Sequence, residues 1–244
     1  MYDFAIVGGG IVGLSTGMAL YQRFPNAKVV VIEKEATLAN HQTGHNSGVI
    51  HSGIFKARFA RQGSKSMTEF CQTYGIEHDI CGKVIVATKQ EELPLLDDLY
   101  TRGLQNQLEI QKISIEELKE IEPHVNGLGA IRVPQAGIVN YRQVSEKFAS
   151  IIRDNSGEIM LQTKVEKIYE KSDHVTIETS RGTFQTRMLI NCAGLHSDRV
   201  AAAAGYKTDM KIVPFRGEYF KLIPEKRYLV KHLIYPVPNP KFPF

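Results

Sequence analysis

Hydrophobic and polar positions along the first 35 residues change their period twice. The apolar run at residues 4–7 predicts a buried strand, and apolar residues then recur at helical spacing over residues 11–21. A second apolar run at residues 29–32 predicts another buried strand. We therefore expect a strand, a helix and a second strand here, in preference to a membrane span over the uncharged residues 4–21.

The middle of the chain alternates between helical and strand patterns. Amphipathic spacing predicts helices, and short apolar runs bounded by turn residues predict strands. The expected helices are residues 56–74, 90–107, 114–123 and 141–154, and the expected strands are residues 82–88, 127–134 and 136–140.

After residue 157 the pattern changes to short strands separated by polar turns. These strands predict an antiparallel meander, at residues 158–163, 164–171, 174–180 and 183–186. The apolar run at 188–194 is typical of a buried parallel strand that returns to the first sheet. A helix at 198–205 and strands at 212–223 and 231–238 are expected after it.

This order of elements predicts an α/β protein with two domains. Two strand–helix units lie far apart in the sequence with antiparallel strands between them, which indicates a Rossmann-like nucleotide-binding domain interrupted by a second domain with a mixed/antiparallel β-sheet. We expect residues 1–76 and 141–210 in the first domain. Residues 77–140 and 211–244 are expected in the second.

A glycine fingerprint lies between the first strand and the first helix. In the pattern G-x-G-x-x-G, Gly8 permits a sharp turn, Gly10 lets the backbone approach a pyrophosphate, and Gly13 allows close helix–strand packing. Glu33 ends the second strand, where a carboxylate can accept hydrogen bonds from a ribose diol. These residues predict a dinucleotide site, but the fingerprint does not distinguish NAD from FAD.

Composition and charge exclude some classes of protein. Apolar residues make up 43% of the chain and charged residues 23%, as in ordinary globular proteins. The net charge of +4 comes from scattered residues, so no nucleic-acid binding is expected. Three cysteines without a C-x-x-C pair predict free thiols in a reducing compartment, and no signal peptide precedes the first strand, so we expect a cytoplasmic protein.

The segment HQTGHNSGVIHSG, residues 41–53, carries three histidines and three glycines. It could be a metal site, a source of catalytic bases, or a loop lying against a ligand. The histidines stand four and six residues apart on a glycine-rich loop without a nearby acidic cluster. We therefore expect no metal.

Longer motifs resemble one enzyme superfamily and, within it, one family. The FAD-dependent amine and hydroxy-acid oxidases of the D-amino-acid oxidase superfamily are similar in the segments DFAIVGGGIVGLSTGMAL and NCAGLHSD and in the Glu33 strand end. The L-2-hydroxyglutarate oxidase/dehydrogenase family is closely similar in HQTGHNSGVIHSG, GIVNYRQV, IVPFRGEYF and KHLIYPVPNP. The likeness covers essentially the whole chain.

The resemblance implies a cofactor, a reaction and an electron acceptor. It implies FAD in the first domain, a substrate domain beside it, and oxidation of the dicarboxylate L-2-hydroxyglutarate to 2-oxoglutarate by hydride transfer to the flavin. Electrons would pass to oxygen or to a respiratory quinone, which leaves room for peripheral contact with the inner membrane. A sister oxidase for glycine or glycerol 3-phosphate, and an inactive flavin-binding remnant, are the alternatives.

The resemblance also assigns residues to the cofactor. The 41–53 loop would run beside the flavin, and His45 and His51 become candidate proton acceptors, although ordinary hydrogen bonding within the loop remains the alternative for each. Cofactor contacts are expected, besides the fingerprint residues, from Lys34, Asn46, Ser47, Gly48, Val165, Ala193 and Gly194.

Substrate contacts are expected from the second half of the chain. Arg216 is the main candidate for a substrate carboxylate, because guanidinium binds carboxylates through two parallel hydrogen bonds. His232 is a weaker candidate, as are Arg142 and Lys231, which surface charge would explain equally well. Tyr235 would close over the substrate or pack in the core.

Two departures from the family pattern bear on activity. About half a dozen residues that relatives have after the HSGI element are absent, judged against usual loop lengths. Relatives also continue beyond Phe244 with strands and a glycine-rich segment. We therefore expect a C-terminally truncated chain with exposed sheet edges and apolar faces.

Overall fold

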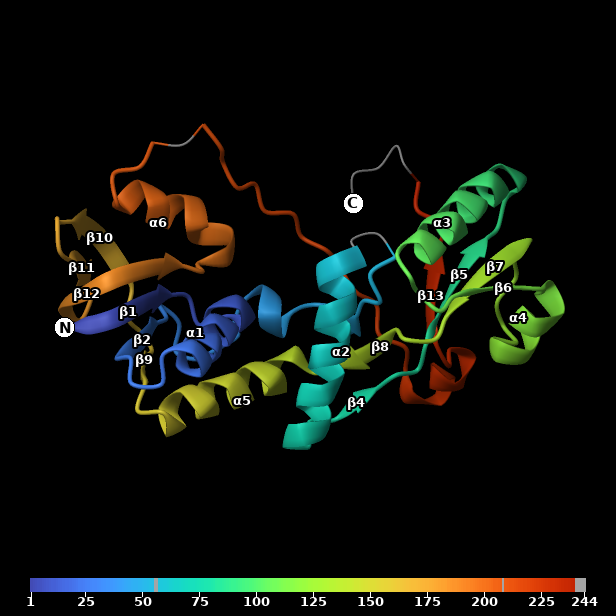
Figure 1. Ribbon diagram of the computed structural model, residues 1–244. Helices are drawn as coiled ribbons and strands as arrows, with labels where there is room; N and C mark the ends of the chain where they lie inside the picture. Colours follow the sequence, from blue (N-terminus) through green and yellow to red (C-terminus); the bar gives the residue numbers. More distant parts are fainter. Residues whose placement is uncertain (55–56, 208, 240–244) are drawn as a thin grey trace. The chain divides into compact units, whose positions relative to one another are not determined.

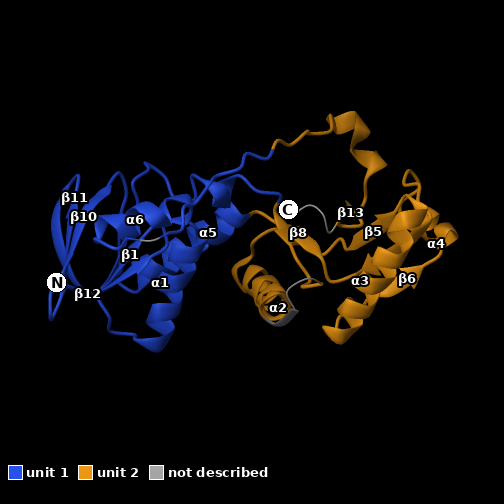
Figure 2. Ribbon diagram, turned by 90° about the horizontal axis from the view of Figure 1, so that it is seen from above, with its two compact units in different colours: residues 1–47, 141–217 blue, residues 48–140, 218–244 orange. Residues whose placement is uncertain are grey.

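The computed structural model describes residues 1–54, 57–207 and 209–239. The chain forms two compact units, shown in blue and orange in Figure 2. Unit 1 comprises Met1–Ser47 and Tyr141–Gly217, and unit 2 comprises Gly48–Asn140 and Glu218–Phe244. This division differs from the expected one mainly in residues 48–76, because strand β3 (Val49–Ile50) pairs with β8 (Gly137–Val139) of unit 2.

Unit 1 is built on one six-stranded sheet with the order β10-β11-β12-β1-β2-β9. Its strands are β1 (Tyr2–Val7), β2 (Val29–Ile32), β9 (Glu158–Met160), β10 (Val165–Glu170), β11 (Val175–Thr179) and β12 (Gly182–Asn191). The strands β9, β2, β1 and β12 run parallel, whereas β10, β11 and the start of β12 form antiparallel hairpins. The sheet therefore combines a nucleotide-binding core with an antiparallel edge.

Strand β12 joins these two parts of the sheet. Its first half pairs with β11 in antiparallel fashion, and its second half, up to Asn191, pairs in parallel with β1. The expected parallel return to the first sheet is present. The two strands expected at 183–186 and 188–194 are one continuous strand, because no turn residue separates them.

Helices of unit 1 pack on this sheet and on each other. Their bounds are α1 (Ile11–Arg23), α5 (Tyr141–Asp154), α6 (Ser197–Ala203), and the 3-10 turns η1 (Gln42–Gly44) and η3 (Gly194–His196). Figure 1 shows α1 and α5 side by side. A Cβ atom on Gly17 of α1 would lie 2.7 Å from Cδ1 of Ile152, so this close approach of α1 and α5 needs a glycine.

Unit 2 contains a mixed four-stranded sheet and a small three-stranded sheet. The larger sheet has the order β13-β5-β7-β6, from β5 (Lys83–Ala87), β6 (Gln111–Ile113), β7 (Gly129–Val133) and β13 (Leu233–Pro236). Only the β13–β5 pair in it is parallel. The smaller sheet places β8 between β3 and β4 (His78–Asp79). The helices are α2 (Ala57–Tyr74), α3 (Leu93–Gln105) and α4 (Ile115–Ile121), with 3-10 turns η2 (Gln90–Glu92) and η4 (Pro224–Leu229).

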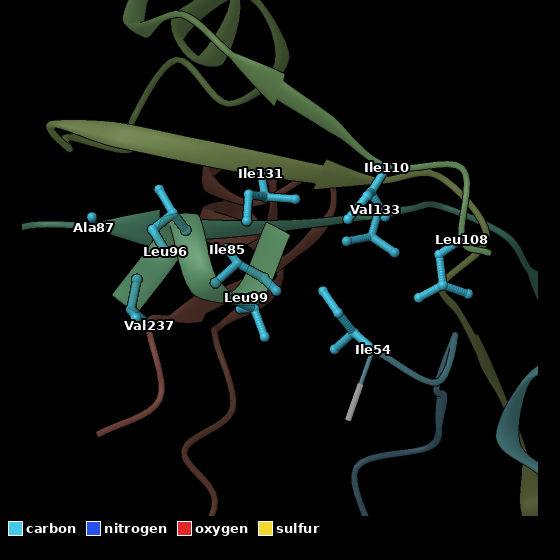
Figure 3. Close-up of a cluster of buried hydrophobic side chains, with 10 residues drawn as sticks. All are labelled: Ile54, Ile85, Ala87, Leu96, Leu99, Leu108, Ile110, Ile131, Val133 and Val237. Atoms are coloured by element: carbon cyan, nitrogen blue, oxygen red, sulfur yellow. The ribbon is translucent and has the colours of Figure 1, made fainter. Parts of the chain in front are cut away.

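An apolar cluster between α3 and the larger sheet forms the main core of unit 2 (Figure 3). Leu96 and Leu99 of α3 pack against side chains of β5 and β7, and Ile54 and Val237 complete the cluster. Full burial of one such side chain contributes about 2 kcal/mol. Helix α4 begins with the expected capping box, in which the Ser114 hydroxyl accepts from the backbone N–H of Glu117 and the Glu117 carboxylate accepts from that of Ser114.

The segment 211–223 lacks the strand that the sequence predicts. Its residues have no regular structure, because no strand in the described part of the chain lies alongside them to provide hydrogen bonds. Val213, Phe215 and Phe220 are exposed there. Among the described residues, no helix has the length and apolar character needed to cross a membrane. The three cysteines are free thiols, as expected.

Candidate FAD site and substrate-binding residues

A cavity of about 930 Å³ opens in unit 1 at the carboxyl ends of β1 and β2. This edge of a parallel sheet is where α/β proteins bind nucleotides. Seven of the expected cofactor residues line the cavity, namely Gly8, Gly10, Glu33, Lys34, Val165, Ala193 and Gly194. The structure therefore brings together residues from four separate segments of the sequence.

The three fingerprint positions require glycine for different structural reasons. Gly8 has a φ of +115°, and a Cβ atom there would lie 2.3 Å from the carbonyl oxygen of Cys192. Gly13 does not line the cavity, but its Cβ would lie 2.0 Å from the carbonyl oxygen of Gly8. Gly10 faces open space except for Oγ1 of Thr43, at 3.3 Å from its Cβ position. Gly8 and Gly13 are thus needed for packing, and Gly10 keeps the cavity floor free.

Glu33 braces the glycine turn from the end of β2. One carboxylate oxygen accepts a hydrogen bond from the backbone N–H of Gly9 at 2.7 Å, and the other accepts from that of Glu35 at 2.9 Å. These bonds hold the turn and the strand end at a fixed separation, and each oxygen retains a further lone pair toward the cavity. Glu33 can therefore accept hydrogen bonds from a sugar hydroxyl while it supports the turn.

The amino-terminal end of α1 opens into the cavity. Gly10 is the N-cap residue and offers no side-chain cap, while the backbone N–H of Ile11 donates to Oγ1 of Thr43 at 3.1 Å. Free N–H groups at a helix N-terminus attract anions. Thr43 comes from the histidine-containing loop, and sequence reasoning missed it because that loop was interpreted through its histidines, asparagine and glycines.

A group of basic side chains also lines the cavity. A carboxylate oxygen of Glu35 contacts Nζ of Lys34 and lies 3.0 Å from Nε2 of His41, and these two hydrogen bonds, Lys34 first, lower the pKa of Glu35. Burial, followed by the positive charges of Lys34 and Arg199, lowers the pKa of His196. Lys34 and Arg199 are thus two cationic side chains of the lining that could contact a phosphate.

His196 is a further residue that the sequence did not identify. Its ring lies edge-on to that of His41 at 5.9 Å, and its Nδ1 atom is buried without a hydrogen-bond partner among the described residues. A buried polar atom without a partner is uncommon in a folded protein. Because His196 lines the cavity, a ligand there can supply the missing partner.

The candidate proton acceptor His45 and the expected cofactor residues Asn46 and Ser47 lie outside this cavity. Nδ1 of His45 lies 3.0 Å from the carbonyl oxygen of His41, and the Asn46 amide donates to the carbonyl oxygens of Gln42 and Thr43 at 3.0 and 2.7 Å. These contacts shape the loop itself. Ser47 is exposed at the end of this part of unit 1.

Two further candidates for substrate contacts belong to unit 1 and do not line the cavity. Arg216 is exposed in the irregular segment 211–223. Arg142, at the start of α5, lies close to Gly44, where a Cβ atom would be 2.5 Å from its guanidinium. The Arg142 side chain therefore packs against the histidine-containing loop.

Unit 2 holds the remaining candidates. Gly48 lies near Val139 with a φ of +70°. Nδ1 of His232 lies 2.9 Å from a carboxylate oxygen of Glu122, which also accepts from the backbone N–H groups of Lys231 and His232 at 2.9 and 2.5 Å. Sequence reasoning missed Glu122, which looked like the polar end of a short helix.

His51 and Tyr235 are associated with a lysine that the sequence did not single out. Nζ of Lys83 lies over the Tyr235 ring, 5.0 Å from its centroid. Burial, and secondly the positive charge of Lys83, lowers the pKa of His51. Burial also raises the pKa of Tyr235. Lys83 begins an otherwise apolar strand, and its charge at a position that the pattern predicts to be buried is the signal that could have identified it.

Comparison with known protein families identifies the family of this chain. The model of the FAD dependent oxidoreductase family matches residues 3–244. The chain belongs to this family. The expected superfamily is therefore confirmed, and of the two cofactors that the glycine fingerprint allowed, FAD is the cofactor of the family.

Curated relatives of this FAD-dependent oxidoreductase are similar along the whole chain. L-2-hydroxyglutarate dehydrogenases of Indibacter alkaliphilus, Escherichia coli K12 and, from mitochondria, Homo sapiens are 49%, 43% and 44% identical to it. Each match covers 100% of this chain and 63%, 60% and 57% of the relative. The chain thus spans about 60% of the length of these relatives. The match to the Indibacter protein runs over 251 positions against 244 residues here, so that relative has additional residues within the matched region.

Solved structures agree with the α/β fold. L-α-glycerophosphate oxidase of Mycoplasma pneumoniae with FAD bound has a TM-score of 0.81 at 25% identity, covering 97% of this chain and 65% of that one. Glycine oxidase of Geobacillus kaustophilus has a TM-score of 0.76 at 25% identity, covering 84% of this chain and 59% of that one.

The residues of the unit 1 cavity fit the FAD of this family. The open floor at Gly10, the N-terminus of α1, the carboxylate of Glu33 and the unpartnered Nδ1 of His196 provide positions for a pyrophosphate and a ribose. Among the described residues, no group of three or more His, Cys, Asp or Glu side chains could hold a metal ion.

Proposed function

We propose that the protein carries out FAD-dependent oxidation of L-2-hydroxyglutarate to 2-oxoglutarate. The observation that carries this proposal is the 43–49% identity to L-2-hydroxyglutarate dehydrogenases over the full length of the chain. The two oxidases for other substrates named above are 25% identical, which favours L-2-hydroxyglutarate over glycine or glycerol 3-phosphate. Bound FAD supplies the redox chemistry by accepting a hydride from the substrate carbon.

The residues of this chain would bind the cofactor, orient the substrate and accept the proton of its hydroxyl group. In unit 1, Gly8, Gly10, Glu33, Ala193 and Gly194 would hold the adenosine and pyrophosphate part of the cofactor, with Lys34 and Val165 beside them. In unit 2, His51 would accept the hydroxyl proton of the substrate. Its lowered pKa supports this role, because it keeps the imidazole neutral near pH 7.

Three further residues complete the proposal for the substrate. Arg216 would bind a substrate carboxylate, and the planar guanidinium suits that group. His232, held by Glu122, would present its Nε2 atom toward the substrate region, and Tyr235 would cover the substrate. Oxygen or a respiratory quinone would be the electron acceptor, with peripheral membrane contact in the second case.

The test is the absorption spectrum of the purified chain before and after anaerobic addition of L-2-hydroxyglutarate. We expect a flavin spectrum that bleaches with L-2-hydroxyglutarate and does not bleach with glycine or glycerol 3-phosphate. Bleaching by one of these other compounds would identify a sister oxidase. A stable flavin spectrum with all three would indicate a flavin-binding chain without this activity.

A further inference from the structure

Lys83 is a buried cation at the start of the central strand of unit 2. Only 3% of its surface is exposed, and its neighbours in the sheet are Leu233 of β13 and Val133 of β7. In the described part of the chain, Lys83 forms no ion pair with a carboxylate. A buried lysine without an acidic partner is costly and therefore rare, so this position calls for an explanation.

The register of the sheet gives the direction of the Lys83 side chain. Side chains alternate along a strand, so Lys83 points to the same face as Ile85, and it shares that face with Val133, its partner on β7. Ile85 and Val133 belong to the apolar cluster of Figure 3, in which Ile54 lies close to Val133. The ammonium group therefore lies at the end of an apolar core, toward the segment that precedes Ile54.

None of the described groups that interact with the Lys83 ammonium carries a negative charge. Lys83 interacts electrostatically with His51, and the Tyr235 ring lies 5.0 Å from its Nζ atom. Ser52, next to His51, is 2% exposed, and its hydroxyl oxygen is buried without a hydrogen-bond partner among the described residues. Burial lowers the pKa of Lys83, and burial together with Lys83 lowers the pKa of His51. An anion beside Lys83 would compensate its positive charge.

Lys112 of the same unit shows how a lysine is placed when it serves structure alone. Its Nζ atom also lies 5.0 Å from a tyrosine ring, that of Tyr100, but it pairs with a carboxylate oxygen of Asp97 at 2.7 Å and is about half exposed. Lys83 has the same contact with an aromatic ring, but it is only 3% exposed and forms no ion pair with a carboxylate of the described residues. The difference between the two lysines is the unfilled position for an anion.

We propose that Lys83 binds a carboxylate group of the substrate, between the Tyr235 ring and His51. The ligand class is a small carboxylate or dicarboxylate, and the site deepens the proposed oxidation of L-2-hydroxyglutarate, on which it rests. A largely buried lysine forms a stronger pair with a carboxylate than an exposed arginine does, because the local dielectric constant is lower. Lys83 would thus fix one end of the substrate, while His51 takes the proton from its hydroxyl.

The test compares Lys83→Met with Lys112→Met in the full chain loaded with FAD. Calorimetric titration would give the dissociation constants of glutarate and L-2-hydroxyglutarate, absorbance the FAD content, and circular dichroism the melting temperature. We expect Lys83→Met to weaken binding of both ligands about tenfold to a hundredfold, as for loss of a hydrogen bond to a charged group. Its FAD content should not change, and its melting temperature should stay equal or rise, because methionine keeps the apolar stem and removes a buried charge.

The control and a charge-retaining variant make the outcome decisive. Lys112→Met should bind both ligands as the unaltered chain does, within about twofold, since its exposed ion pair contributes little. Lys83→Arg should bind glutarate more tightly than Lys83→Met. Unchanged affinity in Lys83→Met would overturn the proposal, and so would a lowered melting temperature with loss of FAD, which would make Lys83 a structural cation.

The same measurements separate this proposal from the proposed function. If the unaltered chain binds glutarate through Lys83 but L-2-hydroxyglutarate does not bleach its flavin, the carboxylate site stands and the proposed reaction fails. If the flavin bleaches equally fast in the unaltered chain and in Lys83→Met, the reaction stands and the carboxylate site fails. A chain that binds neither ligand refutes both.

Discussion

Glu122 should be among the most sensitive single positions for the stability of unit 2. Its side chain is 0% exposed, and one of its carboxylate oxygens accepts three hydrogen bonds, from the backbone N–H groups of Lys231 and His232 and from the His232 ring. The other oxygen is buried without a partner among the described residues. This carboxylate attaches the residues before β13 to the end of α4, across 110 positions of sequence.

The expected cost of Glu122→Ala follows from these contacts. The change leaves two backbone N–H groups and a histidine ring without their acceptor, and each unsatisfied buried donor costs about 1–3 kcal/mol. Removal of the buried carboxylate returns part of this free energy, because one of its oxygens has no partner among the described residues. We therefore expect the free energy of unfolding to fall by roughly 3 kcal/mol, the net loss of several hydrogen bonds to one buried acceptor.

Glu92 provides a matched control for this prediction. Its carboxylate also accepts three hydrogen bonds, from the backbone N–H groups of Thr88 and Lys89 and from the Thr88 hydroxyl, but these bonds are exposed to solvent and the residue is only partly buried. Water can replace an acceptor at that position. Glu92→Ala should therefore lower stability by only a small fraction of the change in Glu122→Ala.

Urea denaturation followed by circular dichroism would measure both variants, and amide hydrogen exchange would show the local effect. In Glu122→Ala we expect a lower denaturation midpoint and faster exchange at the amides of Lys231 and His232. Equal midpoints for the two variants, or unchanged exchange at these amides, would refute the reasoning that the buried carboxylate holds this segment.

Two further predictions concern the glycine turn and pH. Gly10→Ala should fold with a lower FAD content, because its Cβ meets only Thr43 and reduces the space at the cavity floor. Gly8→Ala should be insoluble or unfolded, because its Cβ would lie 2.3 Å from the Cys192 carbonyl oxygen. Soluble yield and flavin absorbance would measure both effects, and equal FAD content in the two variants would contradict this prediction. The pKa of His51 is lowered from its usual 6.5 in the folded chain, so the unfolded chain binds its proton more readily and stability should fall as pH drops below about 6.5. His51→Gln should show a shallower fall in the urea midpoint between pH 8 and about pH 5, and parallel curves for the two proteins would exclude this role.

The sequence by itself determined the elements that depend on local periodicity and local steric needs. The strand–helix–strand start, the capping box at Ser114 and the apolar strand that returns to β1 all follow from patterns within a few residues. The glycine turn follows as well, because φ values and close backbone contacts restrict residue choice at Gly8 without reference to distant parts. Motif resemblance then indicated the family.

One predicted strand is absent and one domain boundary differs from the prediction, because a strand forms only where another strand pairs with it. Residues 212–223 have the apolar content of a strand, but no strand lies alongside them in the described part of the chain. Residues 48–76 belong to unit 2, because the two residues of β3 pair with β8. Such pairing is decided between segments far apart in sequence, where local pattern carries no information.

Only the tertiary structure decided which residues share a site. Thr43 and His196 line the unit 1 cavity beside Gly10 although they stand 153 positions apart in the sequence, whereas the neighbouring Asn46 turns to its own loop. Lys83 meets Tyr235 because β13 pairs in parallel with β5, and Glu122 meets His232 at the same end of unit 2. The physical reason is that burial and charge compensation depend on every segment that packs around a group, so they exist only once the chain has folded.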